Sequence, residues 1–279
     1  MAVDTDAEPA PPDAEGAWVS LFSGGKDSSF ALYRGLERGL DVERLLTVHP
    51  DGDSYMYHVP ATRLAALAAE SVGIDHVDVH PENLGGDAGH DAGARGDAEV
   101  EPLERALRDL DEAIDLAGVT AGAVESEYQT SRIRALCDRL GIALYAPVWR
   151  RDPWTVAEEM IDAGFDTRVV QVAAAGLDAS WLGRPLDRAA LADLRDLNER
   201  YGVHPLGEGG EFETLVVDGP STDPPGPADA TALLTGSTLV RCTGYTRPLR
   251  VKFRVCDRET GRSGVLRAKT RRTASFTRK

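Results

Sequence analysis

Lysine is scarce in this chain of 279 residues: only four of its 31 basic residues are lysines. Three of the four lie near the C-terminus, which leaves Lys26 alone in the remainder of the chain. A compact ammonium on a thin stem approaches phosphate oxygens more closely than the planar arginine fork does. Lys26 therefore raises the hypothesis of a phosphate site, although without its neighbours chance placement explains it equally well.

Cysteine and long apolar runs are also sparse. The three cysteines, Cys137, Cys242 and Cys256, show no C-x-x-C spacing, which argues against a disulfide framework and a zinc site. No apolar run approaches the length of a membrane span, and the N-terminus lacks the basic and apolar regions of a signal peptide. We therefore expect a cytoplasmic protein without a membrane partner.

The charge is distributed unevenly along the chain. Residues 1–240 carry a net charge of -26, whereas residues 241–279 carry +11. Such acidity with so little lysine predicts adaptation to high salt, as in a halophilic archaeon, and makes nucleic acid an unlikely partner of the acidic part. The basic end is either an RNA-contacting arm or a tail without a selected function, and we favour the second.

Alternating apolar strands and amphipathic helices predict the α/β class, with a doubly wound parallel sheet and helices on both faces. A Gly/Asp/Ala-rich stretch at 81–98 is expected to be a loop. The expected strands cover residues 18–22, 44–48, 76–80, 119–124 and 142–147, and the expected helices cover residues 28–38, 61–72, 102–116 and 128–140.

Four regions are expected along the chain. Residues 1–16 are acidic and rich in Ala and Pro, which predicts a disordered lead. The doubly wound domain covers 17–150, a smaller α/β domain covers 151–220, and 221–279 form a linker and a basic tail. The smaller domain should contain a helix from Asp152-Pro153, a strand at 167–172, a helix at 188–200 and a strand at 213–218.

Polar clusters follow four of the expected strands. The first strand runs into SGGKDSS, the second into His49 and then DSYMYH, the fourth into ESEYQTSR and the fifth into PVWRR. Ligands of open parallel sheets bind at the carboxyl ends of the strands, which lie along one edge. The clusters therefore predict one binding site at that edge.

The turn at residues 23–28 joins a buried strand to a helix through two glycines, so backbone N–H groups can face an anion. It is not a Walker A loop, because that motif requires glycine where this chain has Ser20. Asp27 is interpreted either as a Mg²⁺ ligand or as the cap of the following helix, and we favour the cap.

The motif S-G-G-K-D-S after a buried strand resembles the PP-loop ATP pyrophosphatases, which are Rossmann-like proteins that split ATP into AMP and pyrophosphate. Further segments resemble the diphthine-ammonia ligase (diphthamide synthase) family of that group. They are DSYMYHVP (53–60), SEYQTSRI (126–133), APVWRRD (146–152) and GEGGEFETLVVDGP (207–220), which occur in the order expected for the family.

This resemblance implies ATP-dependent amidation of diphthine on translation elongation factor 2, with ammonia as the nitrogen source. ATP would adenylate the substrate carboxylate and release pyrophosphate, and ammonia would displace AMP to give diphthamide. ATP and Mg²⁺ are the implied cofactors. The implied catalytic residues are Lys26, Asp27 and Glu211, and the implied ATP-binding residues are Ser23, Gly24, Gly25, Lys26, Asp27, Ser28 and His49.

Three carboxylates in the segment 208–213 would repel ATP unless they face a cation. We expect them to face the quaternary ammonium of diphthine or incoming ammonium, with Tyr128 or Trp149 offering a ring face. A solvated acidic turn and, for Ser126, simple helix capping are the alternatives. The implied substrate-binding residues are His58, Ser126, Tyr128, Gln129, Arg132, Trp149, Glu208, Gly209, Gly210, Glu211, Glu213 and Thr214.

Two other functions remain open, a tRNA-modifying PP-loop enzyme and a non-catalytic nucleotide sensor. Sulfur transfer to tRNA would require reactive cysteines, but Cys137 follows helical core spacing and is interpreted as a packing residue. His76 and His80 flank Asp78 with strand spacing, yet the sequence provides no further ligand, so no metal is expected there.

Overall fold

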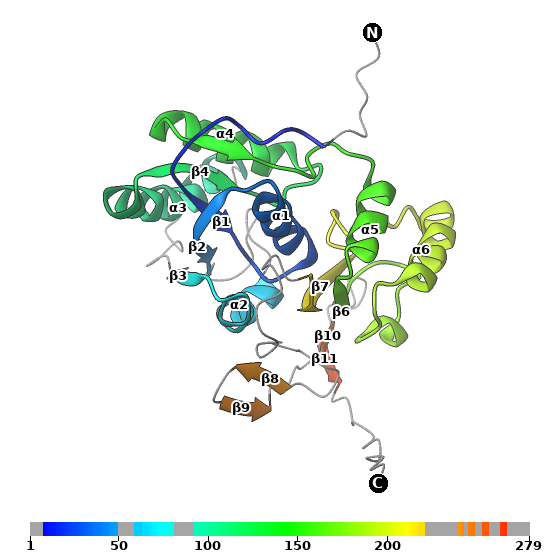
Figure 1. Ribbon diagram of the computed structural model, residues 1–279. Helices are drawn as coiled ribbons and strands as arrows, with labels where there is room; N and C mark the ends of the chain where they lie inside the picture. The colour runs from blue at the N-terminus through cyan, green and yellow to red at the C-terminus, as the bar shows by residue number, and fades with distance from the viewer. Residues whose placement is uncertain are drawn as a thin grey trace.

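The computed structural model describes residues 8–49, 59–80 and 92–220, and four short strands between residues 239 and 266 (Figure 1). The first sheet has the order β3-β2-β1-β4-β5 and all of its strands are parallel. This arrangement confirms the predicted α/β class. The strands are β1 (Ala17–Leu21), β2 (Asp41–Val48), β3 (Asp75–Val79), β4 (Leu116–Thr120) and β5 (Ala143–Tyr145).

Helices cover both faces of this sheet because strand residues alternate between the faces. Leu45 of β2 packs with Ala65 and Ala69 of α2 on one face. Its neighbour Leu46 packs with Leu103 of α3 on the other face. The helices are α1 (Lys26–Glu37) and α2 (Val59–Val72) on the first face, and α3 (Ala92–Ile114) and α4 (Glu127–Leu140) on the second.

The following segment packs against the first sheet's domain through a shared apolar core. Phe30 of α1, with Val124 and Val148, belongs to the cluster that contains the buried side chains of α5 and α6. Asp152 caps α5 by accepting a hydrogen bond from the backbone N of Thr155 at 2.7 Å, as its Asp-Pro start predicts. The elements are α5 (Pro153–Asp162), β6 (Asp166–Val172), η1 (Ala179–Trp181), α6 (Arg188–Tyr201) and β7 (Phe212–Asp218).

Several predicted boundaries differ from the structure, and the two largest differences concern α3 and β4. Helix α3 begins at Ala92 instead of residue 102, so the expected loop does not include residues 92–98, and residues 81–91 lie outside the described part. Pro102, at the first position of the expected helix, lies inside the observed one, where burial of Val100 ahead of it continues the apolar face. Strand β4 ends at Thr120, four residues earlier than predicted.

The segment predicted as a linker and basic tail contributes strands. β10 pairs with β6 in parallel and with β11 antiparallel, which extends the β6–β7 sheet. β8 and β9 form a separate antiparallel pair. The four strands are β8 (Leu239–Cys242), β9 (Tyr245–Pro248), β10 (Phe253–Cys256) and β11 (Ser263–Leu266). In the described part of the chain, no helix is both long and apolar enough to cross a bilayer.

The structure describes the N-terminal lead from residue 8 onward, and residues 8–15 have no regular secondary structure. The Glu8 side chain is only 5% exposed, forms ion pairs with Arg34 and Arg38, and accepts a hydrogen bond from the Tyr145 hydroxyl. Burial acts to raise the pKa of Glu8, but the hydrogen bonds from Arg34, Tyr145 and Arg38 outweigh it, so the pKa lies below its ordinary value. Glu8 therefore holds the lead against α1 and β5.

Glu8→Ala should lower the free energy of unfolding by about 2–3 kcal/mol, because Arg34 and Tyr145 lose a buried partner. The lowered pKa means that this stabilisation is present above pH 4.5, the ordinary value, and is lost as the pH falls through the folded-state pKa. Urea unfolding of both proteins at pH 7 and at pH 3 measures the difference. A difference that is equal at both pH values would contradict the role of the Glu8 charge.

Candidate active site

The glycine turn between β1 and α1 forms a compact loop held by serine hydroxyls. Ser28 Oγ accepts a hydrogen bond from the backbone N of Ser23 at 3.1 Å, and the two hydroxyls lie 3.0 Å apart. Gly24 has a φ of 77°, a left-handed conformation that glycine adopts without strain. Gly25 is the N-cap of α1 and provides no side-chain cap, so the positive end of the helix opens toward the loop.

Lys26 and Asp27 form an ion pair at the start of α1. Lys26 is 4% exposed, and its Nζ lies 2.6 Å from Asp27 Oδ2 and 5.9 Å from the centroid of the Phe212 ring. Asp27 is inside the first turn, so its predicted role as the helix cap is wrong. Its Oδ1 is buried and has no hydrogen-bond partner among the described residues. The pair thus provides one buried cation, the Lys26 ammonium, and one hydrogen-bond acceptor without a partner among the described residues, Asp27 Oδ1.

Strand β7 supports this loop from the second sheet. The backbone N of Val216 donates to the carbonyl of Gly24 at 3.0 Å. The backbone N of Lys26 donates to Thr214 Oγ1 at 3.3 Å. The structure thus places Thr214 against the loop backbone, and its expected role in substrate binding stays a prediction.

Gly122, just after β4, packs directly against the first turn of α1. A Cβ atom at this position would lie 2.5 Å from the backbone carbonyl carbon of Asp27 and 2.6 Å from the backbone N of Ser28. Such contacts are far inside the normal van der Waals distance, so a larger residue would displace the turn. Gly122 is therefore a positioning residue for the loop, and it was not predicted from the sequence.

The acidic turn at 207–210 brings Glu211 to His204. Glu211 Oε1 accepts a hydrogen bond from the backbone N of His204 at 3.3 Å. His204 Nδ1 accepts from the backbone N atoms of Leu206 and Glu208, at 3.2 and 3.4 Å, so the neutral ring carries its proton on Nε2. Glu211 Oε2 and His204 Nε2 are buried and have no hydrogen-bond partner within the described ranges.

His204 shares this site with Lys26 and Asp27. Burial lowers the pKa of His204, Lys26 lowers it further, and Glu125, Glu211 and Asp27 act in the opposite direction. The Nε2 atom lies 3.7 Å from Glu125 Oε2. The site therefore combines a lysine, two spare carboxylate oxygens and one spare N–H donor. His204 and Glu125 were not predicted, and their only sequence signal is proximity to the GEGGEFE and SEYQTSRI segments.

The residues predicted on α4 have local contacts. Ser126 caps α4 by accepting a hydrogen bond from the backbone N of Gln129 at 3.3 Å, which confirms the capping alternative. The Arg132 guanidinium lies 3.8 Å from the centroid of the Tyr128 ring and so covers one face of this ring. Trp149 borders a surface hollow of about 420 Å³ beside α4 together with Glu127.

Cys137 is a core residue, as predicted. It is 2% exposed and packs in the cluster that contains Leu136 of the same helix. Burial, with a smaller effect of Asp138, raises the pKa of the thiol to about 12, which suppresses the reactive thiolate. Cys137 therefore does not provide a sulfur-transfer nucleophile.

Two predicted histidines remain. His49 follows β2 and contacts Asp78 and His80, whereas His58 lies outside the described residues. Glu213 lies on β7 opposite Gln171, and Gly209 and Gly210 form the turn that leads to Glu211. Their roles in ATP or substrate binding stay predictions.

Comparisons with known proteins identify the family. Residues 16–144 match the family model "Diphthamide synthase N-terminal domain", and residues 152–222 match "Diphthamide synthase C-terminal domain". This chain belongs to the diphthamide synthase family. Within the family, it is 35% identical over 221 residues to a diphthine-ammonia ligase of Danio rerio, covering 72% of this chain and 82% of that protein.

Two more relatives show how coverage varies in the diphthamide synthase family. The diphthine-ammonia ligase of Homo sapiens is 32% identical over 213 residues, which cover 72% of this chain and 79% of the human protein. That of Schizosaccharomyces pombe is 35% identical over 215 residues, but the match covers only 34% of its length. The matched family regions contain both the loop with Lys26 and the turn with Glu211.

Proposed function

We propose that this protein is a diphthine-ammonia ligase that amidates diphthine on translation elongation factor 2, with ATP and ammonia as co-substrates. The products are diphthamide, AMP and pyrophosphate. The observation that carries the proposal is a buried lysine in the glycine loop, close enough to His204 to lower the pKa of its ring, in a chain that belongs to the diphthamide synthase family.

The loop at 23–28 binds the β- and γ-phosphates of ATP, which leave as pyrophosphate. Ser23, Gly24, Gly25 and the start of α1 supply N–H and hydroxyl donors, and Lys26 supplies a compact positive charge. The substrate carboxylate attacks the α-phosphorus, the bond to the bridging oxygen of the β-phosphate breaks, and pyrophosphate leaves with the electron pair. An acyl-adenylate results.

Asp27 suits a Mg²⁺ ion. Its Oδ1 is a buried carboxylate oxygen without a hydrogen-bond partner among the described residues, and Mg²⁺ prefers oxygen ligands. Bound there, Mg²⁺ would neutralise charge on the departing phosphates. Lys26, 2.6 Å from the other carboxylate oxygen, holds Asp27 in place.

Glu211 and His204 serve the second step. Ammonia attacks the acyl carbon, AMP leaves, and the attacking nitrogen releases a proton. The spare Oε2 of Glu211 accepts that proton or holds incoming ammonium, while the Nε2–H of His204 donates to an anionic oxygen of substrate or adenylate. The quaternary ammonium of diphthine is the other cation that the acidic turn can attract.

Residues 17–150 act as the ATP-binding domain and residues 151–220 as a smaller substrate-binding domain, which share one apolar core. The net charge of -26 over residues 1–240 supports adaptation to high salt and an origin in a halophilic archaeon. The reaction takes place in the cytoplasm, where elongation factor 2 acts, and requires no contact with membrane or nucleic acid.

One incubation tests the function. The protein is combined with ATP, Mg²⁺, ammonium and elongation factor 2 carrying diphthine, in high-salt buffer. We expect stoichiometric AMP and pyrophosphate, and conversion of one carboxylate into an amide on the elongation factor by mass spectrometry. Release of ADP and orthophosphate, thiolation of added tRNA, or ATP binding without turnover would contradict the proposal.

A further inference from the structure

The carboxyl ends of β2 and β3 present a polar face separate from the loop with Lys26. His76 and Asp78 alternate on β3 and therefore point to the same face of the sheet, and His80 directly follows the strand. Thr47 is the partner of Asp78 in the parallel register, and the backbone N of His49 donates to the carbonyl of Val79 at 2.8 Å. This pairing brings His49 from one strand beside His80 from the next.

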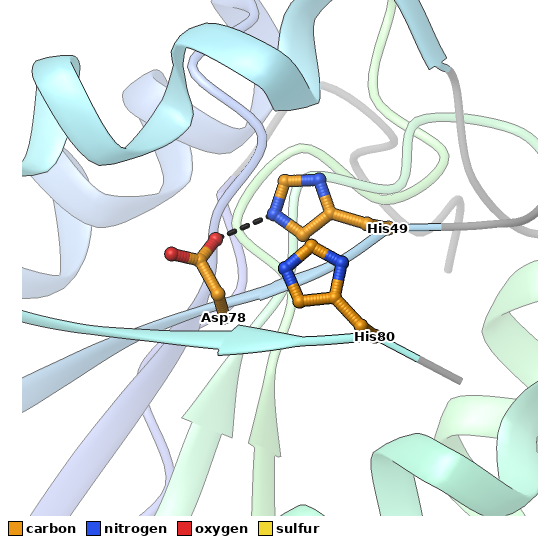
Figure 2. Close-up of side chains that lie close together, drawn as sticks. All are labelled: His49, Asp78 and His80. Atoms are coloured by element: carbon orange, nitrogen blue, oxygen red, sulfur yellow. Dashed lines mark hydrogen bonds and ion pairs between the residues drawn. The ribbon is translucent and has the colours of Figure 1, made fainter. Parts of the chain in front are cut away.

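Three of these side chains converge. His49 Nε2 lies 2.5 Å from Asp78 Oδ1. The rings of His49 and His80 stack with their centroids 4.5 Å apart and their planes 9° apart. One ligand atom from each of the three residues lies within 4.8 Å of the other two. Figure 2 shows that both rings direct a nitrogen toward the Asp78 carboxylate.

The donor set defines the class of ligand. Two imidazoles and a carboxylate suit Zn²⁺ and neighbouring transition metals, whereas Mg²⁺ prefers oxygen ligands alone. Asp78 and His80 are exposed, so solvent can complete the coordination. We propose that His49, Asp78 and His80 form a binding site for a divalent transition metal, with Zn²⁺ as its cation. No metal was expected here, because the sequence around His76, Asp78 and His80 provides no further ligand; His49 lies 29 residues before Asp78.

Neighbouring residues orient the carboxylate. His76 Nδ1 lies 3.3 Å from Asp78 Oδ2, and its Nε2 lies 2.7 Å from Thr47 Oγ1. Thr47 in turn donates to the carbonyl of Phe22 at 2.5 Å. Such outer partners hold metal ligands in orientation. Because Phe22 directly precedes Ser23, this chain of contacts also joins the metal site to the beginning of the PP-loop.

Zinc titration of the full chain tests the site. Protein without an affinity tag is stripped with a chelator, desalted and titrated with ZnCl₂ in a calorimeter. We expect one Zn²⁺ per chain. Asp78→Asn and His80→Ala should each lower the association constant by at least about 10-fold, since each removes a ligand. Co²⁺ should give visible d–d absorption that His80→Ala abolishes.

Asp75→Asn is the matched control. Asp75 belongs to the same strand, but its side chain is 82% exposed and lies 3.6 Å from Arg44, outside the cluster. This variant should bind Zn²⁺ like the wild type, and thermal melting verifies that every variant is folded. The proposal is overturned if the wild type takes up no Zn²⁺, or if Asp78→Asn and Asp75→Asn bind it equally. It is also overturned if His49→Ala weakens ATP binding and leaves Zn²⁺ binding unchanged.

Discussion

Lys26→Met is expected to lower kcat/KM for diphthine-dependent AMP formation by about 10³-fold, because it removes the cation that faces the departing pyrophosphate. The methionine retains the length and apolar stem of lysine in a position that is 4% exposed. AMP is quantified by chromatography and pyrophosphate by a coupled assay. Asp27 loses its 2.6 Å partner, so the melting temperature is measured in parallel.

Two further variants sharpen this experiment. Arg195→Met removes an exposed cation that pairs with Glu158 at 2.9 Å on the outer helices, and it should leave activity unchanged. Lys26→Arg retains the charge, but a planar guanidinium does not fit so buried a position, so activity should stay low. Normal turnover by Lys26→Met, or release of ADP, would refute the role of the loop in pyrophosphate departure.

Glu211→Gln should reduce amide formation by about 10²-fold while ATP affinity stays within a factor of two to three. The amide oxygen still accepts the hydrogen bond from the backbone N of His204, so the turn is preserved. What disappears is the negative charge at Oε2, the atom that has no hydrogen-bond partner among the described residues. Binding of ATP and of diphthine-bearing elongation factor is measured separately, beside single-turnover amidation.

Glu158→Gln is the control for this substitution, because Glu158 is an exposed carboxylate of α5 that pairs with Arg195. It should match the wild type in all three measurements. A loss of ATP affinity alone in Glu211→Gln would mean that the carboxylate acts in the adenylation half of the site. That result would exclude both ammonium and the quaternary ammonium of diphthine as binding partners of the Glu211 carboxylate.

Local patterns were sufficient for most of the first domain. Leu45 and Leu46 alternate between two helix layers, and Asp152 begins α5 through a hydrogen bond three residues away. The errors occur where a distant contact overrides the local signal. Val100 is buried ahead of Pro102 and extends α3. The composition of the acidic, proline-rich lead likewise gives no sign of the contacts that Glu8 makes with Arg34 and Tyr145.

The glycine loop at 23–28 could be predicted from the sequence because its strand, glycines and helix start depend on interactions within a few residues. The position of His204 near Lys26 has a different origin. A shared apolar core and the hydrogen bonds between β7 and the loop bring together residues as far as 188 positions apart. Periodic patterns in the sequence report only local structure and do not predict such a contact. The same holds for His49 and Asp78, whose convergence depends on how two parallel strands are aligned.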